Sequence, residues 1–464
     1  MAGVFHNIYL ASPWLIQVLA VSVYGAKLYL REYGKEFRTL LSEFESHARF
    51  SAAELEAYQA ERIRALIAHC YENVPYYRRV MNDRGLTPAD IRNAADLQKM
   101  PILTRRMLIE NGDDLIARNY KQSDLIVGYT SGTAASPIRV VWDKKVCLMK
   151  TVVDWRQKRQ GGIEPFDRIA YFIGRQIVPA TAKRPPYWRR NWVLNHLFFS
   201  AFHLAHKNMG FYLDKLAKFR PQAIEGFPST LSLVAEYLNR HGQTFPVKAV
   251  FTSAEPLLST QRAAIEKAFC CKVFDFLGMS ERVIFATECN RHEGKHLDTD
   301  FGHTEIVGDE NSPHAKGFGR IVATGLHNYA MPLIRYRTSD VSSFYEEPCS
   351  CGRAFPRIHD VSTRDEDIVT TPDGRYLSPS ALSTATKDLI SVEHIQIIQE
   401  DLHNFVLRLV PRTDFRHEEL APVRRSLQDI LGDQINIRVE IVEHIARTQS
   451  GKFRSIISQV PLKF

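Results

Sequence analysis

The feature that most constrains the fold is a regular alternation of strand and helix patterns between residues 223 and 276. Short apolar segments predict strands at 223–225, 247–252 and 272–276, and helical periodicity predicts helices at 228–239 and 259–269. Helices of this length between strands imply right-handed crossovers and a parallel sheet. Ligands bind at the carboxyl ends of such strands, so we expect the loops that carry Glu255 and Glu281 to contribute to a site.

A second pattern begins near residue 362. The sequence after it predicts strands at 395–398 and 405–410, a helix at 415–431 and a strand at 435–442, which is a small α+β unit. We therefore predict an α/β protein in which a large N-terminal domain, with parallel or mixed sheets and flanking helices, precedes a small α+β C-terminal domain. The expected divisions are an apolar and basic helical segment at 1–50, a large domain at 51–362 and a small domain at 363–464.

Composition narrows the class of protein. The chain has 464 residues, enough for a large core, and a net charge of +8 favours anionic partners such as nucleotides or anionic lipid. We recognise no nucleic-acid-binding motif, so we do not expect nucleic acid as a partner. Seven cysteines in a chain of this length do not make a disulfide-rich secreted scaffold, and we expect a reducing, cytoplasmic location.

The N-terminal segment allows three interpretations. Residues 8–26 carry no charged side chain and approach the length of a membrane span, but Pro13 and several polar residues lower their hydrophobicity. Basic residues, beginning with Lys27, follow the segment. The segment 8–26 is therefore a helix packed on the main domain, a helix lying on the cytoplasmic face of the membrane, or a membrane-spanning helix. The Arg- and Trp-rich segment 180–200 is an exposed loop or a contact with a polar substrate or membrane.

A loop rich in hydroxyl groups follows the apolar residues 125–127. Residues 129–137 read Tyr-Thr-Ser-Gly-Thr-Ala-Ala-Ser-Pro. Gly132 lets the backbone approach a ligand closely, and the hydroxyl and backbone N–H groups can donate hydrogen bonds to phosphate oxygens. The composition favours a polyphosphate loop, although one such loop alone is a weak signal.

Four further segments complete a resemblance. Residues 129–137 resemble the YTSGTTGxP signature of the adenylate-forming (acyl-CoA synthetase) superfamily, and its later motifs follow in the right order: aromatic-Gly-x-(Ser/Thr)-Glu at 276–281, RYRTGD at 335–340, the hinge motif GRxDD at 363–367 and PRTxSGK at 447–452. Residues 71–77, 225–229, 253–256 and 349–353 resemble the phenylacetate-CoA ligase branch. Residues 21–25 and 31–34 resemble the CapK-like proteins of capsule gene clusters.

The resemblance implies a reaction and a set of site residues. ATP and a carboxylic acid would give an acyl-adenylate and pyrophosphate, because AMP is a far better leaving group than a carboxylate oxygen. The implied catalytic residues are Lys452 at the α-phosphate, Glu281 as a Mg²⁺ ligand and Arg364 at the ribose or phosphate. The implied ATP-binding residues are Thr130, Ser131, Gly132, Thr133, Ser253, Ala254, Glu255, Phe276, Gly278, Ser280 and Asp340.

The resemblance also implies that the C-terminal domain is mobile. Family members rotate this domain before the second half-reaction, about a hinge that falls here at Glu366 or Asp367. The chain departs from the family pattern at Ser339 and Thr363, which replace glycines, and at 134–135, where Ala-Ala replaces Thr-Gly. Each change is small for small, so the fold is retained, and loop flexibility and domain rotation are the properties affected.

A Cys/His pattern predicts a metal site. Cys289 and His296, with Cys349 and Cys351, supply four ligands for a closed, structural zinc site. His292 and His303 are alternatives to His296. The competing interpretation is a set of reduced, partly buried cysteines.

Three functions remain open from the sequence. The first is a carboxylic-acid–CoA ligase with ATP, the acid and CoA as ligands. The second keeps adenylation but passes the acyl group to an amine, sugar or carrier thiol, or AMP to a hydroxyl; the CapK-like resemblance favours this role in capsular or exopolysaccharide synthesis. The third is a non-catalytic scaffold. The acid pocket is expected among residues 172–176, 225–228, 253–255 and 276–279, and the sequence indicates no oligomeric state.

Overall fold

The computed structural model describes most of the chain. The described residues are 2–130, 138–174, 176–255, 257, 259–307, 319–359, 369–377, 382, 385–386, 389, 391–446 and 454–460. The expected boundary near residue 362 lies outside them, so the predicted domain divisions remain predictions.

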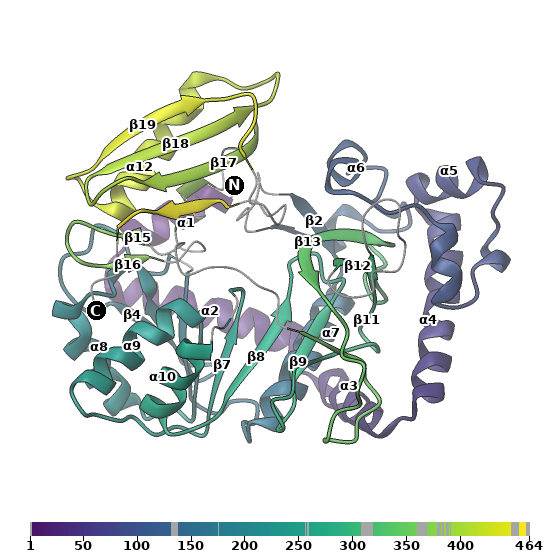
Figure 1. Cartoon of the computed structure of the whole chain (residues 1–464), viewed down its shortest axis with the longest axis horizontal. Coiled ribbons are helices and arrows are strands. Elements are labelled where there is room, and N and C mark those ends of the chain that lie inside the picture. The colour runs from purple at the N-terminus through teal and green to yellow at the C-terminus, as the bar shows by residue number, and fades with distance from the viewer. Residues whose placement is uncertain are drawn as a thin grey trace.

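A nine-stranded sheet forms the centre of the described part of the molecule, in the order β14-β10-β9-β8-β7-β6-β3-β5-β4 (Figure 1). The five strands from β8 to β5 in this order run parallel, and the strands beyond them at both edges run antiparallel. The strands are β3 (Ile169–Ile173), β4 (Trp188–Asn191), β5 (His196–Ser200), β6 (Ala223–Gly226), β7 (Ala249–Ser253), β8 (Val273–Gly278), β9 (Phe285–Glu288), β10 (Lys295–Leu297) and β14 (Arg357–Ile358). The predicted parallel sheet and fold class are confirmed.

Helices cover both faces of this sheet. Because successive side chains of a strand point to opposite faces, Val250 of β7 enters one hydrophobic core while Ala249 and Phe251 enter another. The first core is closed by α8 (Met209–Phe219), α9 (Pro228–Arg240) and α10 (Ser259–Phe269), and the second by α3 (Lys35–Ser46) and α7 (Lys144–Gln160). Burial on both faces explains why these strands read as continuous apolar runs.

Further elements lie beside the central sheet and support the loops described below. They are the hairpin β1 (Ile126–Tyr129) and β2 (Arg139–Trp142), the sheet of β11 (Gly302–Val307), β12 (Gly319–Gly325) and β13 (Tyr336–Ser342), and the helices α4 (Ala52–Asn73), α5 (Pro75–Asp83) and α6 (Arg105–Glu110). The capping box of Ser51 and Glu54 begins α4. Residues of α4, α5 and β12 share one hydrophobic core.

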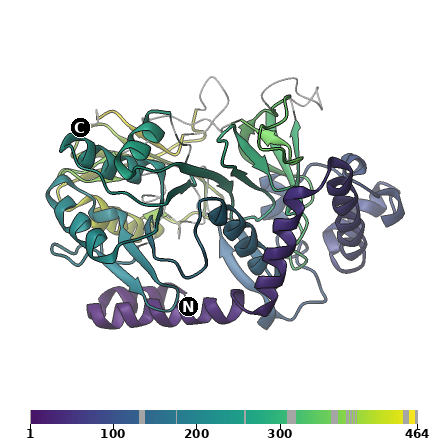
Figure 2. The ribbon, with the colours of Figure 1, turned by 90° about the horizontal axis from the view of Figure 1, so that it is seen from below.

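The N-terminal segment packs on the large sheet. It forms α1 (Ala2–Ala11), α2 (Trp14–Glu32) and α3, and α2 follows the edge strand β4. Asn191 of β4 donates a side-chain hydrogen bond to the carbonyl of Val21 (3.3 Å), and the backbone N–H of Trp192 donates to Ser22 Oγ (3.2 Å). Figure 2 shows this long purple helix along the outside of the molecule. Among the residues described, no helix is long and apolar enough to cross a bilayer.

The expectation of an exposed loop over 180–200 agrees with residues 180–187, where Lys183 and Arg184 are exposed, and is wrong from Trp188 onward. Strands β4 and β5 occupy much of this segment, and Arg189 is buried, where its Nε donates to Gln17 Oε1 (2.7 Å). The polar pattern misled the prediction because β4 is an edge strand whose polar groups are satisfied by α2. Trp192, after β4, stays exposed.

A separate four-stranded sheet follows the central region, in the order β19-β18-β17-β20. Its elements are β17 (Val392–Gln399), β18 (Asn404–Pro411), α12 (Leu420–Leu431), β19 (Asn436–Ile441) and β20 (Ile456–Ser458), preceded by the short strands β15 (Val369–Thr370) and β16 (Tyr376–Leu377). The helix expected from residue 415 begins five residues later, since Pro422 is tolerated only in the first turn of a helix. Figure 1 places this sheet above the nine-stranded sheet.

A buried ion cluster joins the N-terminal segment to the central sheet. Arg156 of α7 contacts Asp298 (2.8 Å) and Asp300 (3.0 Å), and Asp300 also contacts His47 Nδ1 (2.8 Å). All four side chains are buried. Removing the cation therefore leaves uncompensated carboxylates in a medium that solvates charge poorly.

We expect Arg156→Met to lower the free energy of unfolding by about 3–5 kcal/mol, because the Asp298 and Asp300 carboxylates lose their counter-charge. Denaturant unfolding measures the change. Arg79→Met is the matched control, since Arg79 pairs with Asp114 at 3.0 Å where both side chains are nearly half exposed, and it should cost less than about 1 kcal/mol. Equal effects of the two substitutions would contradict the role of the buried cluster.

Candidate functional site

The structure describes nine of the predicted nucleotide-site residues. These are Thr130, Ser253, Ala254, Glu255, Phe276, Gly278, Ser280, Glu281 and Asp340. Seven other predicted residues lie outside the described residues, so their expected roles stay predictions. They are Ser131, Gly132, Thr133, Arg364, Glu366, Asp367 and Lys452.

The β1–β2 hairpin supports the start of the predicted polyphosphate loop. Thr130 closes the hairpin: its N–H donates to the carbonyl of Ile138 (3.0 Å), and its Oγ1 accepts from the N–H of Ile138 (2.9 Å). Gly128 lies against Trp142, where a Cβ atom would come within 2.0 Å of the indole ring. The Trp142 indole N–H in turn donates to the carbonyl of Ser280 (3.1 Å). Trp142 thus holds this hairpin against the loop that carries Glu281.

The carboxyl ends of β6, β7 and β8 bring further predicted residues together. In the parallel register Gly226 pairs with Thr252, and Ser253 pairs with Phe276. The chain turns sharply after β7, because Ala254 has a left-handed φ of 69°. The loops predicted after these strands therefore leave the same edge of the sheet, as expected for a parallel α/β arrangement.

Glu281 is partly buried in a charged environment at this edge. The Tyr336 hydroxyl donates to Glu281 Oε1 (3.3 Å). Burial raises the pKa of Glu281 and nearby Asp340 raises it further, while Tyr336 and Arg105 act in the opposite direction. The backbone N–H of Asp340 donates to Thr338 Oγ1 (2.7 Å), which fixes this turn of β13. Two of the predicted acidic residues are thus close enough to influence each other electrostatically.

Sequence reasoning missed Arg105 as a member of this group. Burial lowers the pKa of Arg105, while Tyr336 and Glu281 favour its charged form. Its position follows from backbone pairing, because Leu103 forms an isolated parallel bridge with Tyr336 and so places Arg105 beside β13. No sequence signal separates Arg105 from the adjacent Arg106, which is exposed.

The C-terminal sheet reaches the same group. Arg412, just after β18, is near enough to lower the pKa of Arg105 by charge repulsion. The site therefore combines Glu281 from the central sheet, Asp340 and Tyr336 from β13, Arg105 from α6 and a cation from the C-terminal unit. A cluster of carboxylates and cations with a hydroxyl can bind a metal ion and an anion together.

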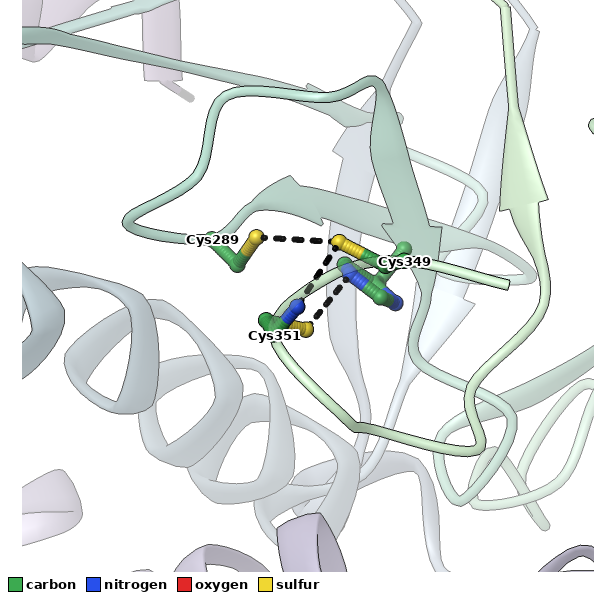
Figure 3. A group of neighbouring side chains, drawn as sticks. Cys289, Cys349 and Cys351 are labelled. Atoms are coloured by element: carbon green, nitrogen blue, oxygen red, sulfur yellow. Dashed lines mark hydrogen bonds between the residues drawn. The ribbon is translucent and has the colours of Figure 1, made fainter. Parts of the chain in front are cut away.

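The four predicted zinc ligands also come together. One ligand atom from each of Cys289, His296, Cys349 and Cys351 lies within 4.8 Å of the others. Figure 3 shows how Cys289, Cys349 and Cys351 lie together. Cys289 Sγ and Cys349 Sγ are 3.7 Å apart, and Cys351 Sγ is 3.3 Å from His296 Nε2. Two sulfur atoms bound tetrahedrally at about 2.3 Å from zinc would be separated by about 3.8 Å, so this geometry fits the metal.

The surroundings of the cluster suit metal binding. His296 Nδ1 contacts the carbonyl of Phe355 (2.9 Å), an arrangement that leaves Nε2 free to serve as a ligand. Burial lowers the pKa of His296 to about 4, which keeps the ring neutral near pH 7. The backbone N–H of Cys351 donates to Cys349 Sγ (3.5 Å). His292 instead contacts Glu288 (3.1 Å), so the cluster favours His296 among the alternatives.

Comparison with known proteins supports the resemblance read from the motifs. Residues 369–459 match the family model of the CapK C-terminal domain. Protein CapK of Staphylococcus aureus is 26% identical over 98% of this chain and 99% of its own length. The phenylacetate-coenzyme A ligase of Thermus thermophilus is 26% identical over 87% of this chain and 96% of its own.

The predicted resemblance to the CapK-like and phenylacetate-CoA-ligase-like adenylate-forming proteins is confirmed. The fold agrees with it. A crystal structure of 2-hydroxyisobutyryl-CoA ligase in the postadenylation state, in complex with R3-HIB-AMP, superposes with a TM-score of 0.56 over 88% of this chain and 90% of its own, at 21% identity. That fold pairs a large α/β region with a C-terminal unit, as observed here.

We expect purified protein to contain zinc in a ratio of about one per chain, and Cys351→Ser to lose it, because three remaining ligands hold zinc less tightly than four. Elemental analysis measures the zinc content. Cys271→Ser is the control, since Cys271 is outside the cluster. Zinc-free protein, or equal zinc in both variants, would favour the alternative of reduced structural cysteines.

Proposed function

We propose that this chain is an ATP-dependent adenylate-forming ligase that activates a carboxylic acid as its acyl-adenylate and transfers the acyl group, in capsular or exopolysaccharide biosynthesis. The observation that carries the proposal is the meeting of Glu281, Asp340, Tyr336 and Arg105 at the carboxyl edge of the parallel sheet. Relatives that match over most of the chain are phenylacetate-CoA ligases, which supports this class of enzyme.

The grouping suits adenylation. Two anions, the acid and the α-phosphate, must approach each other, so a catalyst needs cations and fixed dipoles at the point of attack. Glu281 would hold Mg²⁺, a hard cation that prefers oxygen ligands, and Asp340 would accept hydrogen bonds from the ribose hydroxyls. Arg105 would add positive charge beside Glu281. Lys452 and Arg364 are proposed for the α-phosphate region from their motifs.

The second half-reaction is proposed with CoA or another acyl acceptor. The 2-hydroxyisobutyryl-CoA ligase has been crystallised with 2-HIB-AMP and CoA in the thioesterification state, which supports CoA as one acceptor to test. Arg412, from the C-terminal unit, acts on Arg105, so a rotation of that unit about Glu366 or Asp367 would change the charge at the site. The two half-reactions could thus share one cleft.

The biological role is proposed from the similarity to CapK, which is 26% identical over 98% of this chain. The role would place the enzyme in the cytoplasm, where ATP is supplied. Zinc at the Cys289 cluster would be structural, since four protein ligands leave no open position. It would connect the segment after β9 to the segment after β13. It would so brace β9, which follows the loop that carries Glu281, and β13, which carries Asp340.

The first test is ATP–pyrophosphate exchange against aryl, fatty, amino and uronic acids. We expect exchange with one acid class, and a loss of about 100-fold to 1000-fold in both Lys452→Ala and Glu281→Gln, because each substitution removes charge complementary to the transition state. Added CoA then separates thioester formation from transfer to another acceptor. Nucleotide binding without exchange for any acid would instead favour AMP transfer to a hydroxyl, and no nucleotide binding would favour a scaffold.

The pH dependence of exchange tests the role of Arg105. Its positive charge lowers the pKa of Glu281 against the upward effect of burial. Magnesium binding needs the ionised carboxylate, so activity falls as the pH drops through the pKa of Glu281. Arg105→Met should raise this pKa and move the acidic limb of the pH–rate profile to higher pH.

Arg106→Met is the matched control, because Arg106 lies next in α6 with a side chain that is 84% exposed. It should leave the profile in place. If the Arg105→Met enzyme is less active but its acidic limb does not shift, Arg105 acts in binding or folding and does not control the ionisation of Glu281.

A further inference from the structure

Helix α2 has an inverted distribution of polar and apolar side chains. Its buried residues are Gln17, Gly25 and Glu32. Gln17 accepts from Arg189 (2.7 Å), and Glu32 accepts from the Thr151 hydroxyl (2.6 Å). A helix that covers a sheet usually packs on it through an apolar stripe. Helix α2 is instead attached to the protein by hydrogen bonds and close backbone packing.

The apolar side chains of α2 face outward. Leu15, Leu19, Val23 and Leu30 are 69%, 63%, 60% and 82% exposed. At 100° per residue these four positions fall within 80° of one another around the helix, so they form one continuous face. Isolated exposed apolar residues need no explanation, but a face of this length on one helix indicates a surface that is covered in use.

A tryptophan and basic residues flank this face. Trp192 is 63% exposed and lies next to Ser22. The Arg190 guanidinium lies 4.2 Å from the centre of a Trp192 ring. Tryptophan side chains are enriched at the boundary between lipid and water, because an apolar ring carries a polar N–H.

The charge around α2 is positive. Residues 1–31 contain no acidic side chain, and Lys27 is exposed. In α3, Lys35 and Arg38 are exposed with Glu36 between them. The Lys215 ammonium lies 5.7 Å from the centre of a Trp188 ring, so a further cation lies beside β4, the strand that precedes Trp192. A second copy of the chain would bring two such positive surfaces together, whereas an anionic bilayer complements them.

We propose that the outer face of α2, with Trp192 at its margin, lies in the headgroup layer of an anionic membrane, with the helix parallel to the surface. Hydrogen bonds donated by Arg189, Asn191 and Trp192 hold α2 on the protein while its apolar face enters the lipid. Their acceptors are Gln17, Val21 and Ser22 of α2. Binding combines apolar burial with attraction of the basic residues to anionic lipid. This inference is independent of adenylation.

Vesicle sedimentation tests the inference with the full chain. We expect the protein to sediment with phosphatidylcholine–phosphatidylglycerol vesicles more than with phosphatidylcholine alone, and less as salt is raised. The double variant Leu19→Glu and Val23→Glu should weaken binding by about 100-fold or more, because it replaces two inserted apolar groups by charges repelled from anionic lipid. Lys27→Glu with Lys35→Glu should weaken binding to the anionic vesicles selectively.

Ile441→Glu is the matched control, since Ile441 of β19 is 45% exposed on a different sheet, and its binding should equal that of the native chain. Thermal unfolding and ATP–pyrophosphate exchange in vesicle-free solution show that each variant is folded. The inference is overturned if the native chain stays in the supernatant with both vesicle types, or if Leu19→Glu with Val23→Glu sediments unchanged. A dimer that this variant dissociates, without vesicle binding, would overturn it in favour of a second copy.

Discussion

The parallel pairing of β6, β7 and β8 is the constraint on which the rest of the site depends. Its register aligns Gly226, Thr252 and Phe276 near one edge, so three loops distant in sequence leave the sheet together. Helices α8, α9 and α10 bury one face of these strands, and α3 and α7 bury the other. The register is therefore costly to change, since a slip of one residue would exchange the two hydrophobic cores. The edge is therefore rigid enough to hold charged groups in fixed positions.

Contacts between separate elements then complete the site. Trp142 ties the β1–β2 hairpin to the carbonyl of Ser280, and the bridge between Leu103 and Tyr336 brings Arg105 beside Glu281. In the Cys289 cluster, Cys289 follows β9, His296 lies in β10, and Cys349 and Cys351 follow β13. The hairpin and α6 thus position residues around Glu281, and the cluster joins the segments that follow β9 and β13.

Helix α2 contacts the protein with one face and exposes an apolar face on the opposite side. Attachment through Gln17, Gly25 and Glu32 leaves Leu19 and Val23 free to face outward. The sequence offered packing on the core and lying on a membrane as competing interpretations of residues 8–26. The structure shows the packing. Because this packing uses polar residues, the apolar side chains of α2 face outward, which is the basis of the membrane inference.

The sequence alone determined the order of elements from β6 to β8 and the start of α4, because periodicity, Pro228 and the Ser51 capping box act locally. Its motifs also selected Glu281, Asp340 and the four members of the Cys289 cluster. Tertiary structure decided what local pattern cannot encode. Arg105 is half-buried near Glu281 while Arg106 is exposed, and the polar side of α2 faces inward. Each depends on pairing between residues far apart in the chain, since burial and charge proximity are properties of the assembled fold.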